Sequence, residues 1–178
     1  MAKLSSPRRW GNQHITLYHG TLDIHTASIM KGVDLRYARE DTDFGKGFYT
    51  TTLNRQALRW AWQLSGQVDG TKPAIIQFEV NRDELASLDI ICFVRGDFEA
   101  DDFWSLVFHC RTDQDHHGRG KADGWYDLAI GPVAARWKHR VAFSRANGSD
   151  FDADQVSFHT PRAVKLLNQS QPKLLSWR

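Results

Sequence analysis

The absence of any long apolar segment constrains the fold of this chain more than any other feature. The longest stretch without a polar or charged residue is Leu128–Ala135, and it is interrupted by Gly131 and Pro132. This is far shorter than the roughly 20 residues that a membrane-spanning helix needs. The first residues, MAKLSSPRRWGNQ, are basic but lack the apolar segment of a secretory signal. We therefore expect a soluble protein of the cytoplasm, or one delivered into a target cell by a specialised route, with no membrane partner.

The composition predicts one globular domain. Hydrophobic residues make up 41% and charged residues 25% of the 178 residues, which is sufficient for a sizeable core. The net charge of +2 is well below that of a dedicated nucleic-acid binder. The two cysteines, Cys92 and Cys110, have no CxxC spacing, which indicates a reducing compartment and no structural zinc. We expect residues 1–13 to form a polar lead-in and residues 14–178 a single domain.

Hydrophobic periodicity and helix-capping residues predict short strands and helices in mixed order. Helices are expected after Asp23, after Asn54, from Asp101 and from Pro161, where Thr160 is the cap. Strands are expected at residues 15–19, 48–52, 74–80, 88–94, 125–133, 155–159 and 173–177. Strands outnumber helices and the order is not a regular strand–helix alternation. The predicted fold class is therefore α+β with a largely antiparallel sheet.

Three short segments stand out as candidates for chemistry: Tyr18–Thr21 (YHGT), Asp43–Thr51 (DFGKGFYTT) and Asp154–Thr160 (DQVSFHT). Their order and spacing resemble the ADP-ribosyltransferase superfamily, and within it the branch with a His-Tyr-Glu triad. That branch includes the poly(ADP-ribose) polymerases and the small rifamycin-modifying transferases. A group of small bacterial domains in this superfamily is still more similar, and has a strand like Tyr126–Ala134 (YDLAIGPVA). The resemblance covers residues 15–177 and implies a split, mostly antiparallel sheet with flanking helices.

The resemblance implies that NAD is a substrate and that its nicotinamide–ribose bond is cleaved through an oxocarbenium-like state. His19 would then bond a ribose hydroxyl, and Thr21 would orient His19. The backbone of Gly20 would clamp the nicotinamide carboxamide, because glycine permits a close approach. Tyr49 would stack on the nicotinamide ring, with Gly47 beside it in the same motif.

Two further parts of the expected site concern charge. An arginine from the segment between the first two motifs, Arg36 or Arg39, would bind the pyrophosphate of NAD, because the guanidinium fork matches the geometry of a phosphate. Gln155 occupies the position of the family's glutamate, and it supplies a hydrogen bond but no negative charge. Chain elongation in the polymerase branch goes with that glutamate, so Gln155 favours transfer of one ADP-ribose unit. The carboxylates available to compensate are Asp43, Asp152 and Asp154.

Several other residues have an ordinary structural interpretation. His116 and His117 are adjacent and lack a third ligand at helical spacing, so a solvated loop is favoured over a metal site. Trp60 and Trp62 are two residues apart on a helix and cannot share one face, so Trp62 is expected in the core rather than in a base-stacking platform. Cys110 is expected to be buried in a helix.

The predicted function is therefore an NAD-dependent mono-ADP-ribosyltransferase that modifies a protein or a nucleic acid. Small bacterial domains of this kind resemble toxins of toxin–antitoxin or phage-defence modules, or delivered effectors, so the resemblance implies an antitoxin or immunity protein as a candidate partner. NAD hydrolysis is one alternative, with water as the acceptor. A catalytically weak or inactive module that binds a nucleotide or a partner is the other, and Gln155 keeps it open. Acceptor choice is expected to depend on residues 139–154, and the mild positive charge permits RNA or DNA.

Overall fold

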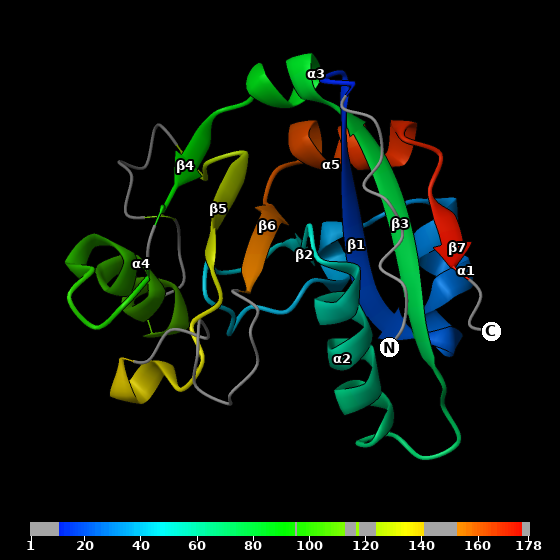
Figure 1. Cartoon of the computed structure of the whole chain (residues 1–178), viewed down its shortest axis with the longest axis horizontal. Coiled ribbons are helices and arrows are strands. Elements are labelled where there is room, and N and C mark those ends of the chain that lie inside the picture. Colours follow the sequence, from blue (N-terminus) through cyan, green and yellow to red (C-terminus); the bar gives the residue numbers. More distant parts are fainter. Residues whose placement is uncertain (1–10, 95, 113–116, 118–123, 141–152, 176–178) are drawn as a thin grey trace, which may run out of the picture.

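The structure is a computed structural model that describes residues 11–94, 96–112, 117, 124–140 and 153–175. Over these residues the chain forms a mixed α+β fold with five helices and two open, mostly antiparallel sheets (Figure 1). This confirms the fold class predicted from the sequence. Most of the predicted polar lead-in and most of residues 139–154 lie outside the described residues.

The first sheet has the strand order β1-β3-β7. Its strands, β1 (His14–Leu22), β3 (Pro73–Asn81) and β7 (Lys173–Leu175), are antiparallel to their neighbours. Residues of β1 and β3 pair over the whole length of both strands, with Tyr18 opposite Gln77. β1 therefore has one edge bonded to β3 and the other edge turned towards the second sheet.

The second sheet has the strand order β2-β6-β5-β4. It consists of β2 (Phe48–Thr50), β6 (Asp154–Phe158), β5 (Leu128–Pro132) and β4 (Ile90–Cys92). The β4–β5 pair is parallel and the other pairs are antiparallel. Gln155 lies opposite Gly131 in this sheet, which places the third motif beside the YDLAIGPVA segment.

The helices flank the two sheets, with α4 beside the second sheet at the left of Figure 1 and α2 against β1. Their bounds are α1 (Asp23–Lys31), α2 (Asn54–Ser65), α3 (Arg82–Ala86), α4 (Asp101–Thr112) and α5 (Pro161–Gln169), with short 3₁₀ turns η1 (Leu35–Tyr37) and η2 (Trp137–His139). Thr160 caps α5 as predicted, because its hydroxyl accepts a hydrogen bond from the N–H of Ala163. Asn54 is the first residue of α2 rather than its cap.

The elements that the sequence did not predict are η1, α3 and η2. Each is too short to show a helical period, which needs apolar residues recurring three or four positions apart over several turns. Helix α3 has a recognisable capping signal nonetheless, because the Asn81 side chain accepts hydrogen bonds from the N–H groups of Asp83 and Glu84.

Two apolar clusters hold the sheets in place. One includes Leu17, Phe78 and Phe158 and fills the space between the sheets and α5. The other includes Phe44 and Trp104 and packs α4 on the second sheet. Cys110 belongs to this second cluster and is fully buried, as predicted, and burial raises its thiol pKa to about 12.

The prediction that Trp62 lies in the core was wrong. Its side chain is 61% exposed, and that of Trp60 is 48% exposed. The buried residues of α2 are Ala57 and Ala61, which present only small side chains to the sheet. The backbone of α2 comes so close to β1 that a bulky indole has no room on the inner face.

The two sheets meet at one pair of residues. Tyr18 of β1 and Thr51 exchange two backbone hydrogen bonds, with N···O distances of 2.8 and 2.9 Å. The pairing is an isolated bridge that does not continue into a ladder. The sheet is therefore split beyond Tyr18, at the position of the first motif.

Within the described part of the chain, none of the helices has the length and apolar character needed to cross a membrane.

Candidate functional site

The free edge of β1 at Gly20 is the first component of the candidate site. In an antiparallel strand, the N–H and C=O of one residue point to the same side, and residues two apart share that side. Tyr18 directs these groups at Thr51 and away from β3, so Gly20 directs its own N–H and C=O into the split between the sheets. The described residues supply no hydrogen-bond partner for either group.

Gly20 is also required by packing. A Cβ atom at this position would lie 2.1 Å from the carbonyl oxygen of Ala57 in α2. Any larger residue would push α2 away from β1, so the glycine of the first motif has a structural reason that does not involve a ligand. The position of α2 in turn leaves the backbone edge of Gly20 facing the split.

His19 is held in one tautomer next to this edge. Its Nδ1 lies 2.7 Å from the carbonyl oxygen of Tyr49, so Nδ1 carries the proton and donates it. Its ring stacks on Phe48, with 4.2 Å between ring centroids. Burial lowers the pKa of His19 to about 4, so the ring is neutral at pH 7 and Nε2 is left as a hydrogen-bond acceptor. Among the described residues, Nε2 has no partner.

Tyr49 is anchored through its hydroxyl. The hydroxyl donates to the carbonyl oxygen of Gly45 at 2.8 Å and accepts from the N–H of Phe44 at 2.9 Å, with the Thr42 hydroxyl 2.8 Å away. Burial raises the pKa of the Tyr49 phenol far above its ordinary value. The hydroxyl therefore shapes the turn at residues 42–45, and only the ring remains to contact a ligand.

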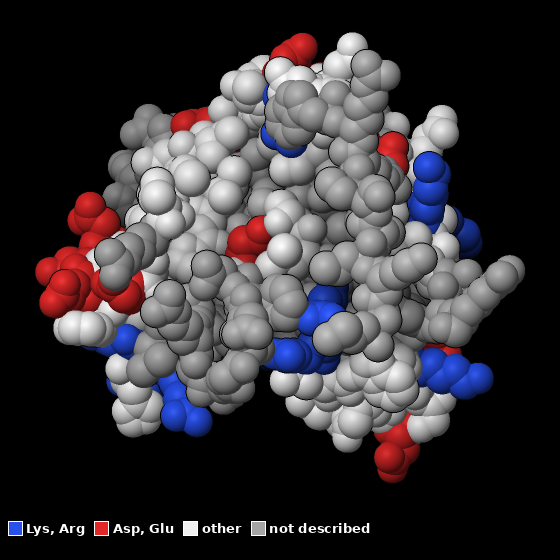
Figure 2. Space-filling view, in the orientation of Figure 1, with Lys and Arg blue, Asp and Glu red and all other residues white. Residues whose placement is uncertain are grey.

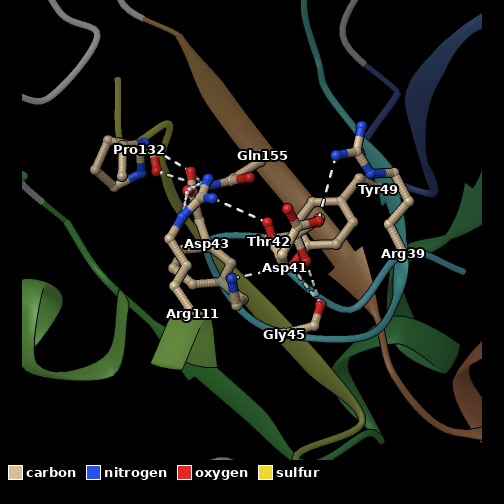
Figure 3. Close-up of polar contacts among 11 residues, drawn as sticks. Arg39, Asp41, Thr42, Asp43, Gly45, Tyr49, Arg111, Pro132 and Gln155 are labelled. Carbon is tan, nitrogen blue, oxygen red and sulfur yellow. Dashed lines mark hydrogen bonds and ion pairs between the residues drawn. The ribbon is translucent and has the colours of Figure 1, made fainter. Parts of the chain in front are cut away.

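Asp43 lies in that turn and is the centre of a buried polar network (Figure 3). One carboxylate oxygen accepts from Nε and Nη2 of Arg111 at 3.0 and 2.6 Å. The other accepts from the N–H of Ala134 at 2.7 Å and from Nε2 of Gln155 at 2.9 Å. The ion pair with Arg111 balances the charge of Asp43, which is only 4% exposed.

Gln155 has a single amide orientation in this network. Its Nε2 donates to Asp43 and, at 2.9 Å, to the carbonyl oxygen of Pro132. Both partners are acceptors, so they bind the NH₂ group and fix the opposite side of the amide as an oxygen. No described residue donates to that oxygen. The resemblance noted in the sequence led us to expect a glutamate at this position, and the structure supplies a reason that an amide fits here.

The three motifs therefore meet, with the second motif joining the first to the third. His19 bonds the carbonyl of Tyr49, and the Tyr49 hydroxyl bonds the turn. Asp43 in the same turn bonds Gln155.

The predicted pyrophosphate ligands lie at the surface. The side chain of Arg36 forms an ion pair with Asp34 at 2.6 Å, and that of Arg39 with Asp41 at 3.3 Å. This pairing lowers the pKa of Asp34 and raises that of Arg36. Such exposed pairs contribute little to stability, so an anion can compete for either guanidinium.

Thr21 and Gly47 have positions that differ from the expected roles. Thr21 is buried, and among the described residues no hydrogen bond joins it to His19, which is oriented by Tyr49 instead. A Cβ atom on Gly47 would lie 2.6 Å from Nδ1 of His159. The second glycine of GKG therefore makes room for this buried histidine.

His117 is buried, in contrast to the solvated position expected for it. Its Nε2 lies 2.8 Å from the carbonyl oxygen of Phe44, and its Nδ1 accepts from the N–H of Tyr126. It packs edge-on against His159, whose pKa burial lowers to about 3. Both rings contact backbone carbonyls of the 42–48 segment. The described residues contain no cluster of three metal ligands, and His116 lies outside them.

Sequence reasoning missed Arg111 and the N–H of Ala134. Arg111 stands at the end of α4 and is separated from Asp43 by more than sixty residues, and no motif marks it. Besides Asp43 it binds the carbonyl oxygen of Asp41 at 2.9 Å and lies over the ring of Trp137. The sequence shows only that Asp43 precedes a glycine-rich motif, whereas its burial, which requires a cation nearby, is visible only in the structure.

Comparison with known proteins gives one match. No curated protein and no solved structure matches the chain. A family model matches residues 15–142, which include the first two motifs, Arg111 and β5, and end before the third motif. Because the match covers well over half of the chain, this protein belongs to the family described as a protein of unknown function, DUF3990.

Proposed function

We propose that this protein is an NAD-dependent mono-ADP-ribosyltransferase. The observation that carries the proposal is the free N–H and C=O of Gly20 beside a neutral histidine with an unused acceptor nitrogen. A carboxamide such as that of nicotinamide has one donor and one acceptor group, and it complements a free strand edge as another strand would. The Nε2 of His19 would accept a hydrogen bond from a ribose hydroxyl.

The reaction consists of one bond broken and one formed. The bond between the nicotinamide nitrogen and the ribose C1′ breaks, and its electron pair leaves with nicotinamide, which becomes neutral. The acceptor then forms a bond to C1′ and releases its proton to solvent. Positive charge develops on the ribose between these events, so groups that accept hydrogen bonds from the ribose stabilise the transition state more than bound NAD.

Gln155 would act as such an acceptor through its amide oxygen. Asp43 holds the NH₂ group of Gln155 at 2.9 Å, so the amide dipole has its negative end away from Asp43. The amide lacks the full charge of a glutamate, which supports transfer of one unit rather than chain elongation. The same weakness supports NAD hydrolysis or a non-catalytic nucleotide-binding role as the second candidates.

The same proposal assigns roles to two further parts of the site and to the protein in the cell. Arg36 or Arg39 would exchange its aspartate for the pyrophosphate of NAD. The Tyr49 ring would contact the nicotinamide. A bacterial toxin or defence role, in the cytoplasm or in a target cell, would require a protein that neutralises the activity.

Incubation of the protein and a cell lysate with NAD labelled in its adenylate tests the proposal. We expect label on macromolecules, and protease and nuclease digestion then identify the acceptor class. Free labelled ADP-ribose alone would support hydrolysis, and intact NAD would support the binding role.

A matched pair of histidines on β1 tests the site. His19→Ala should lower the rate about 5- to 150-fold, which corresponds to roughly 1–3 kcal/mol for an unpaired polar group. His14→Ala, at an exposed position of the same strand, should leave the rate unchanged. Equal rates for the two variants would exclude His19 from the reaction.

A further inference from the structure

The outer face of α2 is unusual for a surface helix. Trp60 and Trp62 are largely exposed on different sides of the helix, while the inner face consists of alanines. Arg55 and Arg59 are also exposed, and α2 contains no acidic residue. Figure 2 shows Lys and Arg side chains over the beginning of α2, near the centre of this face of the molecule.

Helical geometry aligns three of these residues. Arg55, Arg59 and Trp62 follow the i, i+4, i+7 spacing, so they form one ridge along the outside of α2. An exposed tryptophan at the end of two arginines provides one flat stacking surface and two positive charges in line. Trp60 lies outside the ridge, because residues two apart in a helix do not share one face.

We infer that this ridge binds single-stranded nucleic acid, with a base stacked on Trp62 and phosphates on the arginines. Stacking on aromatic side chains beside a positively charged track is the general mode of sequence-tolerant recognition of single strands. Duplex DNA or RNA fits less well, because its bases are already stacked on each other.

The ridge does not have the character of a protein-docking helix. A helix that docks into a protein groove presents apolar anchors at i, i+4 and i+7. Two of those three positions are arginines here, and Gln56 and Gln63 flank them. The charges therefore favour a polyanion over an apolar partner or a second copy of this chain.

The location of the ridge gives it a role in the proposed reaction. The inner face of α2 contacts Gly20, so the ridge is separated from the free edge of β1 by about one helix diameter, roughly 10 Å. A strand bound along α2 would pass beside the split between the sheets. The inference thus names single-stranded nucleic acid as the acceptor class, and in this respect it rests on the proposed function.

Binding is measured without NAD, so that a failure of catalysis and a failure of this inference remain distinguishable. The protein is titrated into fluorescently labelled 20-nucleotide single-stranded RNA, single-stranded DNA and duplex DNA at 50 and 200 mM salt, with anisotropy as the readout. We expect tighter binding of the single strands than of the duplex, and weaker binding at the higher salt concentration.

Four variants locate the binding surface. Trp62→Ala should weaken binding of single strands about 5- to 150-fold, and Arg59→Gln should weaken it and reduce its salt dependence by about one phosphate contact. The controls are Phe98→Ala, an aromatic residue that is 68% exposed elsewhere, and Lys165→Gln on the exposed face of α5. Both controls should bind as the wild type does.

Three results would overturn the inference. They are absence of single-strand binding at 50 mM salt, equal affinities of all variants, and preference for the duplex. Sedimentation of the wild type and of Trp62→Ala tests whether a second copy of this chain binds the ridge instead. A dimer that is lost in the variant would make the ridge a self-association surface. Because Trp62 is exposed, its replacement should leave the melting temperature unchanged, and Arg59→Gln gives an independent result if it does not.

Discussion

The two sheets contribute to the candidate site in opposite ways. The first sheet supplies a free backbone edge at Gly20 and the neutral ring of His19, whose hydrogen bonds involve no ionised side chain. The second sheet supplies Gln155, which is held by the buried ion pair of Asp43 and Arg111. The first sheet therefore presents uncharged groups to the candidate site, and the second sheet contains its buried charges.

This difference explains why an amide suits position 155 better than a carboxylate. Asp43 already places a carboxylate oxygen 2.9 Å from the side chain of Gln155, and the Pro132 carbonyl lies equally close. A second carboxylate at this position would face two acceptors. Glutamine satisfies both and still presents an oxygen.

The largest expected effect comes from Asp43→Asn, which breaks the network on the second sheet. The substitution leaves the largely buried guanidinium of Arg111 without its countercharge, and removal of one partner of a buried pair costs about 3–5 kcal/mol. Urea denaturation measures the free energy of unfolding. Asp41→Asn, which removes an exposed pair with Arg39, should change it by less than about 1 kcal/mol. Similar losses in the two variants would show that the buried network is not a stabilising centre.

Gln155→Glu tests the electrostatic explanation for the amide. The introduced carboxylate would lie against Asp43, and we expect a loss of stability of about 2 kcal/mol at pH 7.5. Repulsion raises the pKa of the new carboxyl, so the protonated form, which donates as the amide does, becomes favoured as the pH falls. The deficit relative to wild type should therefore be smaller at pH 5 than at pH 7.5.

The double variant Asp43→Asn/Gln155→Glu is the control for this explanation. Removal of the first carboxylate should make the second one less unfavourable, so the two effects should not add. Additive effects would mean that Asp43 and residue 155 do not interact. NAD cleavage by Gln155→Glu should not exceed that of the wild type, because the new carboxyl is neutral or displaced.

Tyr49→Phe separates the hydroxyl from the ring. The N–H of Phe44 would lose its partner, while the carbonyl of Gly45 would keep the Thr42 hydroxyl, with an expected cost of about 1–2 kcal/mol in unfolding free energy. NAD affinity, measured by calorimetry, should remain within about threefold, because the proposed contact involves only the ring. Tyr37→Phe is the matched control, since Tyr37 is 82% exposed. Loss of NAD binding with unchanged stability would reverse the roles assigned to ring and hydroxyl.

The sequence predicted the first half of the site better than the second for a physical reason. His19 and Gly20 are adjacent in the chain, and their role depends on one strand, whose period of two is visible in the residues themselves. Asp43, Arg111 and Gln155 come from a turn, a helix and a strand, and their contacts depend on how α4 packs on the second sheet. The prediction for Trp62 was wrong for a related reason. The close approach of α2 at Gly20, which excludes an indole from the core, is a tertiary contact.

The smallest expected effect concerns the pH dependence of stability that arises from two histidines, His19 in β1 and His159 after β6. His19 and His159 titrate near 6.5 in the unfolded chain, whereas burial lowers their pKa values to about 4 and about 3 in the folded protein. Between pH 6.5 and 4 the unfolded state therefore binds more protons, and stability decreases as the pH falls. The stabilisation is complete above pH 6.5.

Replacement of the His19 ring tests whether stability decreases as the pH falls. His19→Asn keeps a donor for the carbonyl of Tyr49 but does not titrate, so its stability should decline less than that of the wild type between pH 7.5 and 5.5. We expect a difference of about 1 kcal/mol in this interval, given that His19 is only half-buried. His14→Ala should follow the wild-type curve, because the ring of His14 is exposed. Parallel curves for wild type and His19→Asn would mean that the pKa of His19 is the same in the folded and unfolded states, so that burial does not hold the ring neutral.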